Sequence, residues 1–313
     1  MEPGLLKSAE WALLIDLYFF LGGLAGGAFV VATVAALVDE RRFRSLMRVG
    51  YKVALLAIIP GPVLLVLDLG RPSRFFHMLL AAKSSADIGM NVVTVGPFHL
   101  KLLSPMSAGA WALLLFGICA FLAVLLISLE DRKRRRFSLS RAIVGIVGSL
   151  FGFFVAAYPG VLLGATTRPL FLGAHWLGAL FLAVGAATGA AAIALILSLL
   201  GGQNREALSR LMSFTAFALV LEVAFLALFV ASAWATGSAG IRQALGQLLA
   251  GFDGVLFWLG AVGIGLVVPL ALHFAGAIRK GNPELAAIVS VLVLAGGFFV
   301  KYVVITAGQR VLS

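Results

Sequence analysis

Residues 11–38 read WALLIDLYFFLGGLAGGAFVVATVAALV, a run longer than the roughly 20 apolar residues that cross a bilayer as one helix. One acid, Asp16, interrupts the run, and glycines cluster at its middle. Gly23 and Gly27 lie four residues apart, so they share a helix face on which another backbone can approach closely. A cation-rich segment, DERRFRSLMRVGYK at 39–52, follows. We therefore predict a membrane-spanning helix that packs within a helical bundle.

The composition extends this prediction to the whole chain. Its 313 residues are 62% hydrophobic and only 12% charged, which is typical of a polytopic α-helical membrane protein. The apolar runs are continuous and do not alternate, which excludes an outer-membrane barrel. The formal net charge is +11, but the cations lie in short loops between spans, so we expect no nucleic-acid partner. The one cysteine, Cys119, excludes a disulfide framework and a cysteine-bound cluster or zinc site.

The hydropathy pattern predicts eight membrane-spanning helices. They cover about residues 11–38, 49–69, 107–129, 141–164, 175–199, 211–235, 254–278 and 284–306. Of the 24 Lys and Arg residues, fifteen lie in the loops after the first, third, fifth and seventh spans, and eight lie at the termini or in the other loops. By the positive-inside rule, both termini are periplasmic in a bacterial or archaeal cytoplasmic membrane.

We expect two four-helix bundles, one in residues 1–170 and one in residues 171–313. The fifth span has a small-residue core like that of the first span, as a duplicated half would. The longest connection is the periplasmic segment 70–107, which begins with the amphipathic GRPSRFFHMLLAAKSS. It is either a docking platform for a partner subunit or a lid over the polar interior of the bundle. On the docking interpretation, Arg74, His77 and Arg168 contact the partner.

Ionisable and polar groups within spans are expensive, so each requires an explanation. Asp16 near the start of the first span is either an interfacial acid paired with a neighbouring cation or a proton acceptor. Tyr158 precedes Pro159, which removes a backbone donor and kinks the helix. A phenol beside such a kink can hydrogen-bond a ligand carbonyl or pass a proton, although a tyrosine at this depth can also be a simple interfacial anchor.

Other polar groups lie at the end of the second span and in the second half. Asp68 and Arg71 in LDLGRP have the spacing of an ion pair at the membrane edge. Glu222 lies halfway along the sixth span and requires protonation or a partner, for which Lys301 and His273 are the candidates. This group is either a proton path or a buried structural bond. Only His273 of the four histidines lies clearly inside a span, which argues against a haem held between helices.

Six segments, spread in order over nearly the whole chain, together resemble the NrfD/PsrC family. They are LYFFLGGLAGGAF (17–29), LDLGRPSRFFHML (67–79), SPMSAGAW (104–111), YPGVLLGATTRPLF (158–171), ALFLAVGAATGAA (179–191) and GGFFVKYVVITAGQ (296–309). This family is the integral membrane subunit of polysulfide reductase and related complexes.

The resemblance implies an eight-helix subunit that binds menaquinone or ubiquinone near the periplasmic face and carries no haem or iron–sulfur cluster. It implies two partners, a ferredoxin-like subunit with [4Fe–4S] clusters and a molybdenum or tungsten bis-pterin catalytic subunit. The function expected is therefore exchange of electrons and protons between the quinone pool and the iron–sulfur subunit of a respiratory oxidoreductase. The substrate of the catalytic subunit stays open.

The resemblance also implies a quinone site. Tyr158 occupies the tyrosine position of the family's Y-x-G-V-L-L segment, which contacts the quinone. The family's Asn and His before the first span are missing here, and Lys7, Glu10 and Asp16 are the polar groups in that region. Our hypothesis is that Tyr158 holds a quinone carbonyl and that Asp16 or Glu10 exchanges its proton. A secondary transporter with Glu222 as its buried coupling acid is the alternative.

Overall fold

The computed structural model describes residues 13–69, 71–80, 93–95, 98–100, 104–133, 137–166, 168–172, 174–201, 205–276 and 281–310. The first half contains α1 (Leu13–Asp39), α2 (Arg44–Ile58), α3 (Pro60–Asp68), the 3₁₀ helix η1 (Pro72–Met78), the strands β1 (Val93–Val95) and β2 (Phe98–Leu100), α5 (Pro105–Lys133) and α6 (Ser138–Gly164). The second half contains α7 (Pro169–Leu172), α8 (Leu177–Leu199), α9 (Arg205–Thr236), α10 (Ala239–Leu249), α11 (Gly251–Val255), the π-helical η2 (Leu256–Val267), α12 (Val268–Phe274) and α13 (Pro283–Arg310). The two strands form an antiparallel hairpin in which Thr94 pairs with His99.

Eight helical stretches within the described residues are long and apolar enough to cross a membrane, which confirms the predicted all-α polytopic membrane protein. The second and sixth stretches begin at Arg44 and Arg205, several residues before the predicted starts at 49 and 211. Ion pairs explain the extensions: Arg44 bonds to acids, and Glu206 pairs with Arg210 one turn later at 3.1 Å. Because the charged side chains here pair with one another, the helix can begin among them, before the apolar run starts.

Two of the spanning helices are irregular. Pro60 has no N–H to continue the ladder, so α2 ends at Ile58 and α3 begins at the proline itself. Gly61 then faces the Tyr18 ring of α1, where a Cβ would come within 3.3 Å of the ring. The seventh span contains the long π-helical segment η2, in which Gly265 lies against the backbone of Gly296 in α13. A small residue at both positions makes this close approach possible.

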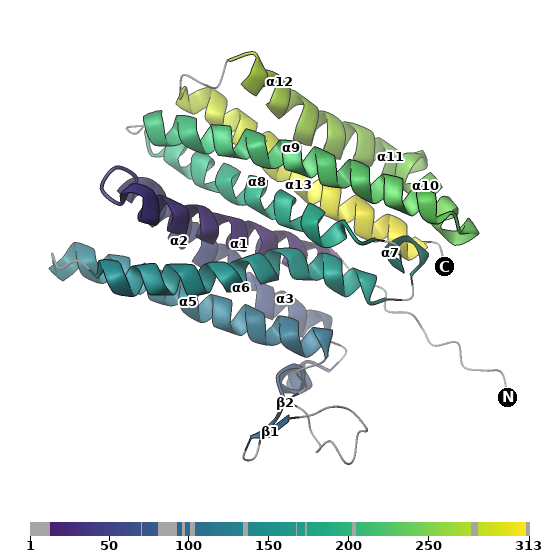
Figure 1. Cartoon of the computed structure of the whole chain (residues 1–313), viewed down its shortest axis with the longest axis horizontal. Helices are drawn as coiled ribbons and strands as arrows, with labels where there is room; N and C mark the ends of the chain where they lie inside the picture. Colours follow the sequence, from purple (N-terminus) through teal and green to yellow (C-terminus); the bar gives the residue numbers. More distant parts are fainter. Residues whose placement is uncertain are drawn as a thin grey trace.

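The centre of the molecule is the contact between α1 and α8. Gly27 and Gly185 pack backbone to backbone, and a Cβ on Gly27 would overlap the carbonyl of Gly185. On its other sides α1 contacts α2, α3 and α6, whereas α8 contacts α9 and α13 (Figure 1). The glycine face predicted from the sequence is therefore the seam that joins the first and second halves of the chain. The division into two four-helix bundles at residue 170 stays a prediction.

The structure contains a helix that the sequence analysis did not separate, α10 between the sixth and seventh spans. Ser238 caps it by accepting a hydrogen bond from the Ile241 N–H at 3.3 Å. Its buried face packs against α7, α9 and α13. The segment is too short and too polar for a spanning helix, so a search for long apolar runs passes over it.

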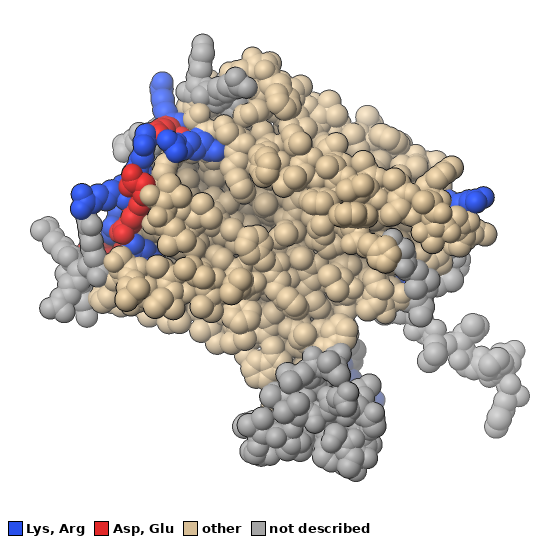
Figure 2. Space-filling view, in the orientation of Figure 1, with Lys and Arg blue, Asp and Glu red and all other residues tan. Residues whose placement is uncertain are grey.

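Charged side chains on the face shown in Figure 2 gather at one end of the molecule. We call this the basic end; it contains the turns from α1 to α2, α5 to α6 and α8 to α9. At the opposite end, the terminal end, α1 begins and α13 finishes (Figure 1). The flanks between the two ends are covered by apolar side chains, as a lipid-facing surface requires. The periplasmic location of the termini stays a prediction.

Candidate functional site

Tyr158 lies in the last two turns of α6 at the terminal end and is 7% exposed. Its hydroxyl donates to the Pro105 carbonyl at the start of α5, at 2.7 Å. Gly109, one turn further along α5, makes room for the phenol ring, because a Cβ at this position would overlap it. The ring of Phe154 stacks on Tyr158 with centroids 5.4 Å apart and is itself 42% exposed. Phe154 therefore connects the phenol to the lipid-facing surface.

A second tyrosine, which the sequence analysis did not identify as a site residue, accompanies Tyr158. Tyr18 of α1 is buried against Gly61 of α3 and lies near enough to Tyr158 to interact with it electrostatically. Its place follows from the packing of α1: Tyr18 lies one helical turn before Gly22, which packs against Val155 of α6. Two phenols from α1 and α6 thus share the interior at the terminal end of the first four spans.

Asp16 occupies the first turn of α1 and is 3% exposed. Its Oδ1 atom has no hydrogen-bond partner within the part of the chain that the structure describes. With 3.6 residues per turn, Asp16 shares the helix face of Gly23 and Gly27, which packs on α8. Tyr18, two residues later, points to the opposite side of the helix. Asp16 and Tyr158 therefore lie at the same end of the molecule but on different sides of α1.

The other quinone-site candidates from the amino-terminal segment, Lys7 and Glu10, lie outside the described residues. The predicted ion pair between Asp68 and Arg71 is not formed: both residues are exposed, and the ion pairs of the described residues do not include it. Helix α3 ends at Asp68, and the chain is extended at Leu69, which removes the one-turn spacing that the pair needs.

The three residues expected at a partner interface have different environments. Arg74 is exposed on η1, and His77 is half-buried with its ring 4.3 Å from that of Phe76. Arg168 is only 6% exposed and donates to the Gln309 carbonyl at 2.5 Å. Arg74 is thus accessible to another molecule, whereas Arg168 ties the start of α7 to the end of α13.

Glu222 and Lys301 are each 1% exposed and lie close enough to interact electrostatically, but the ion pairs of the described residues do not join them, so their partnership stays a prediction. Lys301 also donates to the Phe19 carbonyl of α1 at 2.7 Å and lies 5.1 Å from the centre of the Phe181 ring. One lysine therefore links α13 to α1 across the seam. His273, the other candidate partner, is half-buried in α12 near the basic end.

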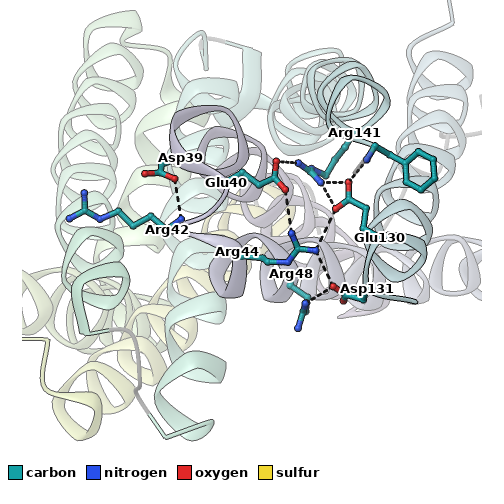
Figure 3. Close-up of polar contacts among 9 residues, drawn as sticks. Asp39, Glu40, Arg42, Arg44, Arg48, Glu130, Asp131 and Arg141 are labelled. Carbon is teal, nitrogen blue, oxygen red and sulfur yellow. Dashed lines mark hydrogen bonds and ion pairs between the residues drawn. The ribbon is translucent and has the colours of Figure 1, made fainter. Parts of the chain in front are cut away.

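The basic end contains a buried ion-pair cluster that the sequence analysis missed, shown in Figure 3. Arg141 of α6 donates to both carboxylate oxygens of Glu130 at 2.5 Å and pairs with Glu40 at 2.5 Å. The Phe137 N–H also donates to Glu130, at 2.8 Å. The side chains of Glu130 and Arg141 are 1% and 3% exposed. Arg141, counted from the sequence as a loop cation, is instead a buried structural residue.

The cluster continues to the surface through two arginines of α2. Arg44 contacts Glu40 at 3.3 Å, Asp131 at 3.0 Å and Glu130 at 3.7 Å. Arg48 contacts Asp131 at 2.7 Å. Figure 3 shows these residues coming from the ends of α1, α2, α5 and α6. The sequence did contain a signal for this cluster: Glu40 and Glu130 follow the first and third apolar runs, and an acid at the end of a span needs a cation nearby.

Comparison with known proteins agrees with the fold. The family model described as "Polysulphide reductase, NrfD" matches residues 2–313. The chain is 27% identical to a polysulfide reductase chain of Wolinella succinogenes, over 97% of the present sequence and 95% of that protein. It is 28% identical to the protein NrfD homolog of Haemophilus influenzae, over 96% and 94% of the two sequences. It is 21% identical to a selenate reductase subunit of Mesobacillus selenatarsenatis, over 95% and 73%.

Proposed function

The chain belongs to the NrfD family, and on this premise we propose that it exchanges electrons and protons between a membrane quinone or quinol and an iron–sulfur partner subunit. The exchange takes place at the terminal end, which we assign to the periplasmic face. Relatives named as subunits of polysulfide and selenate reductases support a role within an oxidoreductase complex, with a molybdenum or tungsten bis-pterin subunit as the catalytic partner. The quinone is menaquinone or ubiquinone.

Tyr158 is the residue that we assign to the quinone head. Its phenol can donate one hydrogen bond, and in the structure it donates to the Pro105 carbonyl. Rotation of the hydroxyl away from this carbonyl directs the donor to a ligand. Access through the membrane suits a hydrophobic ligand, because the exposed Phe154 ring covers Tyr158 from the lipid side. Tyr18 supplies a second phenol on the protein side of Tyr158.

The observation that carries the proposal is the buried carboxylate of Asp16. A quinol supplies two electrons and two protons when it is oxidised, so the protein needs a titratable group that accepts protons near the site. Asp16 lies at the depth of Tyr158, and its Oδ1 is buried without a partner in the described structure. Buried polar atoms are normally satisfied, and exceptions often mark function. Because α1 separates the two residues, we assign binding to Tyr158 and proton acceptance to Asp16.

The electron partner docks on the same end in this proposal. The helix η1 carries exposed Arg74, Phe75 and Phe76, the last two 50% and 46% exposed. Exposed aromatic and arginine side chains are typical of protein interfaces. The docking platform predicted from the sequence therefore has accessible contact residues on its described part.

The test is quinol oxidation by the purified complex carrying single variants. Tyr158→Phe should raise the quinol KM and weaken binding of a quinone-site inhibitor about tenfold, the effect of one lost hydrogen bond of about 1.4 kcal/mol. Asp16→Asn should lower kcat about 100-fold while inhibitor binding is unchanged. Tyr51→Phe is the matched control, because Tyr51 is a fully buried tyrosine bonded to Thr33 nearer the basic end.

Wild-type quinol oxidation in both Tyr158→Phe and Asp16→Asn would contradict the proposed site. If the purified chain also carried no quinone-dependent activity and took up a solute in liposomes, the secondary transporter would be favoured. Glu222, buried beside Lys301, would then be the coupling acid to test.

A further inference from the structure

Two adjoining cavities run along the membrane-facing seam between the halves of the chain. The larger, about 400 Å³, lies between α1, α6, α8 and α9, and its described lining residues are all glycine, alanine, valine, leucine or phenylalanine. The smaller, about 220 Å³, shares Val30, Val31, Val34 and Phe214 with the larger cavity and continues to Arg210. We call the two together the α1–α9 groove. It runs from the middle of the bundle to the basic end.

The groove exists because small residues line its floor. Gly26 of α1 packs against the backbone of Gly152 of α6, Ala183 of α8 lies beside them, and α8 packs between α1 and α9. The rims are large apolar side chains that face outwards, with Val34 and Phe217 53% and 59% exposed. An open apolar groove of this depth at membrane level is filled by hydrocarbon, because water finds no polar partner on its walls.

The two ends of the groove differ in charge. Its deep end has no polar side chain among the described lining residues, so these offer nothing to a quinone head or any other polar head group. At the basic end the Arg210 guanidinium lies 5.4 Å from the centre of the Phe43 ring, and the side chain is 57% exposed. Arg42 and Arg210 both pair with the same acid, Glu206, which leaves an excess of positive charge.

We propose that the α1–α9 groove binds an anionic phospholipid from the leaflet at the basic end. One acyl chain lies in the two cavities, and the phosphate lies between Arg210 and Arg42. Arginine suits this role because its planar guanidinium pairs with phosphate through two hydrogen bonds and stacks on an aromatic ring, as Arg210 does on Phe43. The lipid fills the seam where α1 and α9 do not pack directly, so it contributes to holding the halves together.

The experiment uses the delipidated complex and native mass spectrometry to count bound lipid after addition of phosphatidylglycerol or phosphatidylethanolamine at equal concentration. Arg210→Gln removes a head-group contact, and Ala186→Phe fills the larger cavity, which Ala186 lines. Arg132→Gln is the control, because Arg132 is an exposed arginine of α5 at the same end but outside both cavities.

We expect wild type and Arg132→Gln to retain phosphatidylglycerol in preference to phosphatidylethanolamine. Arg210→Gln should weaken phosphatidylglycerol binding about fivefold, since one cation at the surface contributes about that factor. It should weaken phosphatidylethanolamine binding less, because the ammonium group of that lipid already neutralises its phosphate. Ala186→Phe should reduce occupancy by both lipids; if this variant does not fold, the selectivity of Arg210→Gln decides alone. Equal phosphatidylglycerol binding in wild type and Arg210→Gln would overturn the proposal. The proposal would also be overturned if Ala186→Phe lost a co-purifying quinone but retained lipid, because the groove would then hold the quinone.

Discussion

The buried ion-pair cluster at the basic end allows a quantitative prediction for Arg141→Met. Arg141 is 3% exposed at its side chain and holds Glu130 and Glu40, each at 2.5 Å. Without it, Glu130 keeps only the Phe137 N–H and the more distant Arg44, at 3.7 Å, among its described contacts. Breaking one side of a buried ion pair costs about 3–5 kcal/mol, because the remaining charge stays buried without compensation.

Since Arg44 still compensates part of the Glu130 charge, we expect the lower end of this range, about 3 kcal/mol. At about 2–4 °C per kcal/mol for a chain of a few hundred residues, the unfolding midpoint should fall by about 6–12 °C. The assay is thermal unfolding in detergent micelles followed by tryptophan fluorescence. Arg42→Met is the matched control: its ion pair with Glu206 is 49% and 43% exposed, and such pairs contribute at most about 1 kcal/mol.

The double variant Glu130→Met/Arg141→Met separates charge from packing. Replacing both partners of a buried pair by apolar side chains of similar size is often nearly neutral, so this protein should recover most of the lost stability. The reasoning is refuted if Arg141→Met shifts the midpoint no further than Arg42→Met does. It is also refuted if the double variant is less stable than Arg141→Met alone.

Two further predictions concern the seam between α1 and the second half. Gly27→Val should destabilise the chain and broaden its size-exclusion peak, because a Cβ at Gly27 overlaps the Gly185 carbonyl, whereas Gly117→Ala, with open space around it, should be neutral or slightly stabilising. Lys301→Met should lower the unfolding midpoint, since it removes the hydrogen bond to the Phe19 carbonyl and the cation that interacts with the buried Glu222, and Lys301→Met/Glu222→Leu should restore part of the loss. An unchanged midpoint in Lys301→Met would show that the two side chains are not coupled in stability.

The spanning helices could be predicted from the sequence because each is long, apolar and bounded by charge, and the membrane allows few alternatives for such a segment. The packing face of α1 was equally readable from Gly23 and Gly27, which indeed contact the second half. The helix starts were less accurate, since hydropathy ends at the first cation while the helix continues through Arg44 and Arg205. The local composition does not show which of these cations form ion pairs with acids.

The candidate site was harder to predict for a geometric reason. Depth along a span can be read from residue number, so Asp16 and Tyr158 were placed correctly at the same end. Position around the helix depends on which neighbours lie on which side, and the sequence does not order helices in the plane of the membrane. The structure puts Tyr18, and not Asp16, on the side of Tyr158. The Glu130–Arg141 pair was missed for the same reason, because it joins two different helices.

The buried acids at the two ends of the molecule, Glu130 and Asp16, differ in their partners. At the basic end, Glu130 and Arg141 are buried yet each makes several short contacts, so their charges fix the positions of α1, α2, α5 and α6 relative to one another. At the terminal end, Asp16 is equally buried but leaves Oδ1 without a partner in the described structure. Because Glu130 and Arg141 are both paired, they make this end rigid, whereas a buried acid with an unpaired oxygen can accept a proton or a hydrogen bond from a ligand. The contrast supports assigning structure to one end and proton exchange to the other.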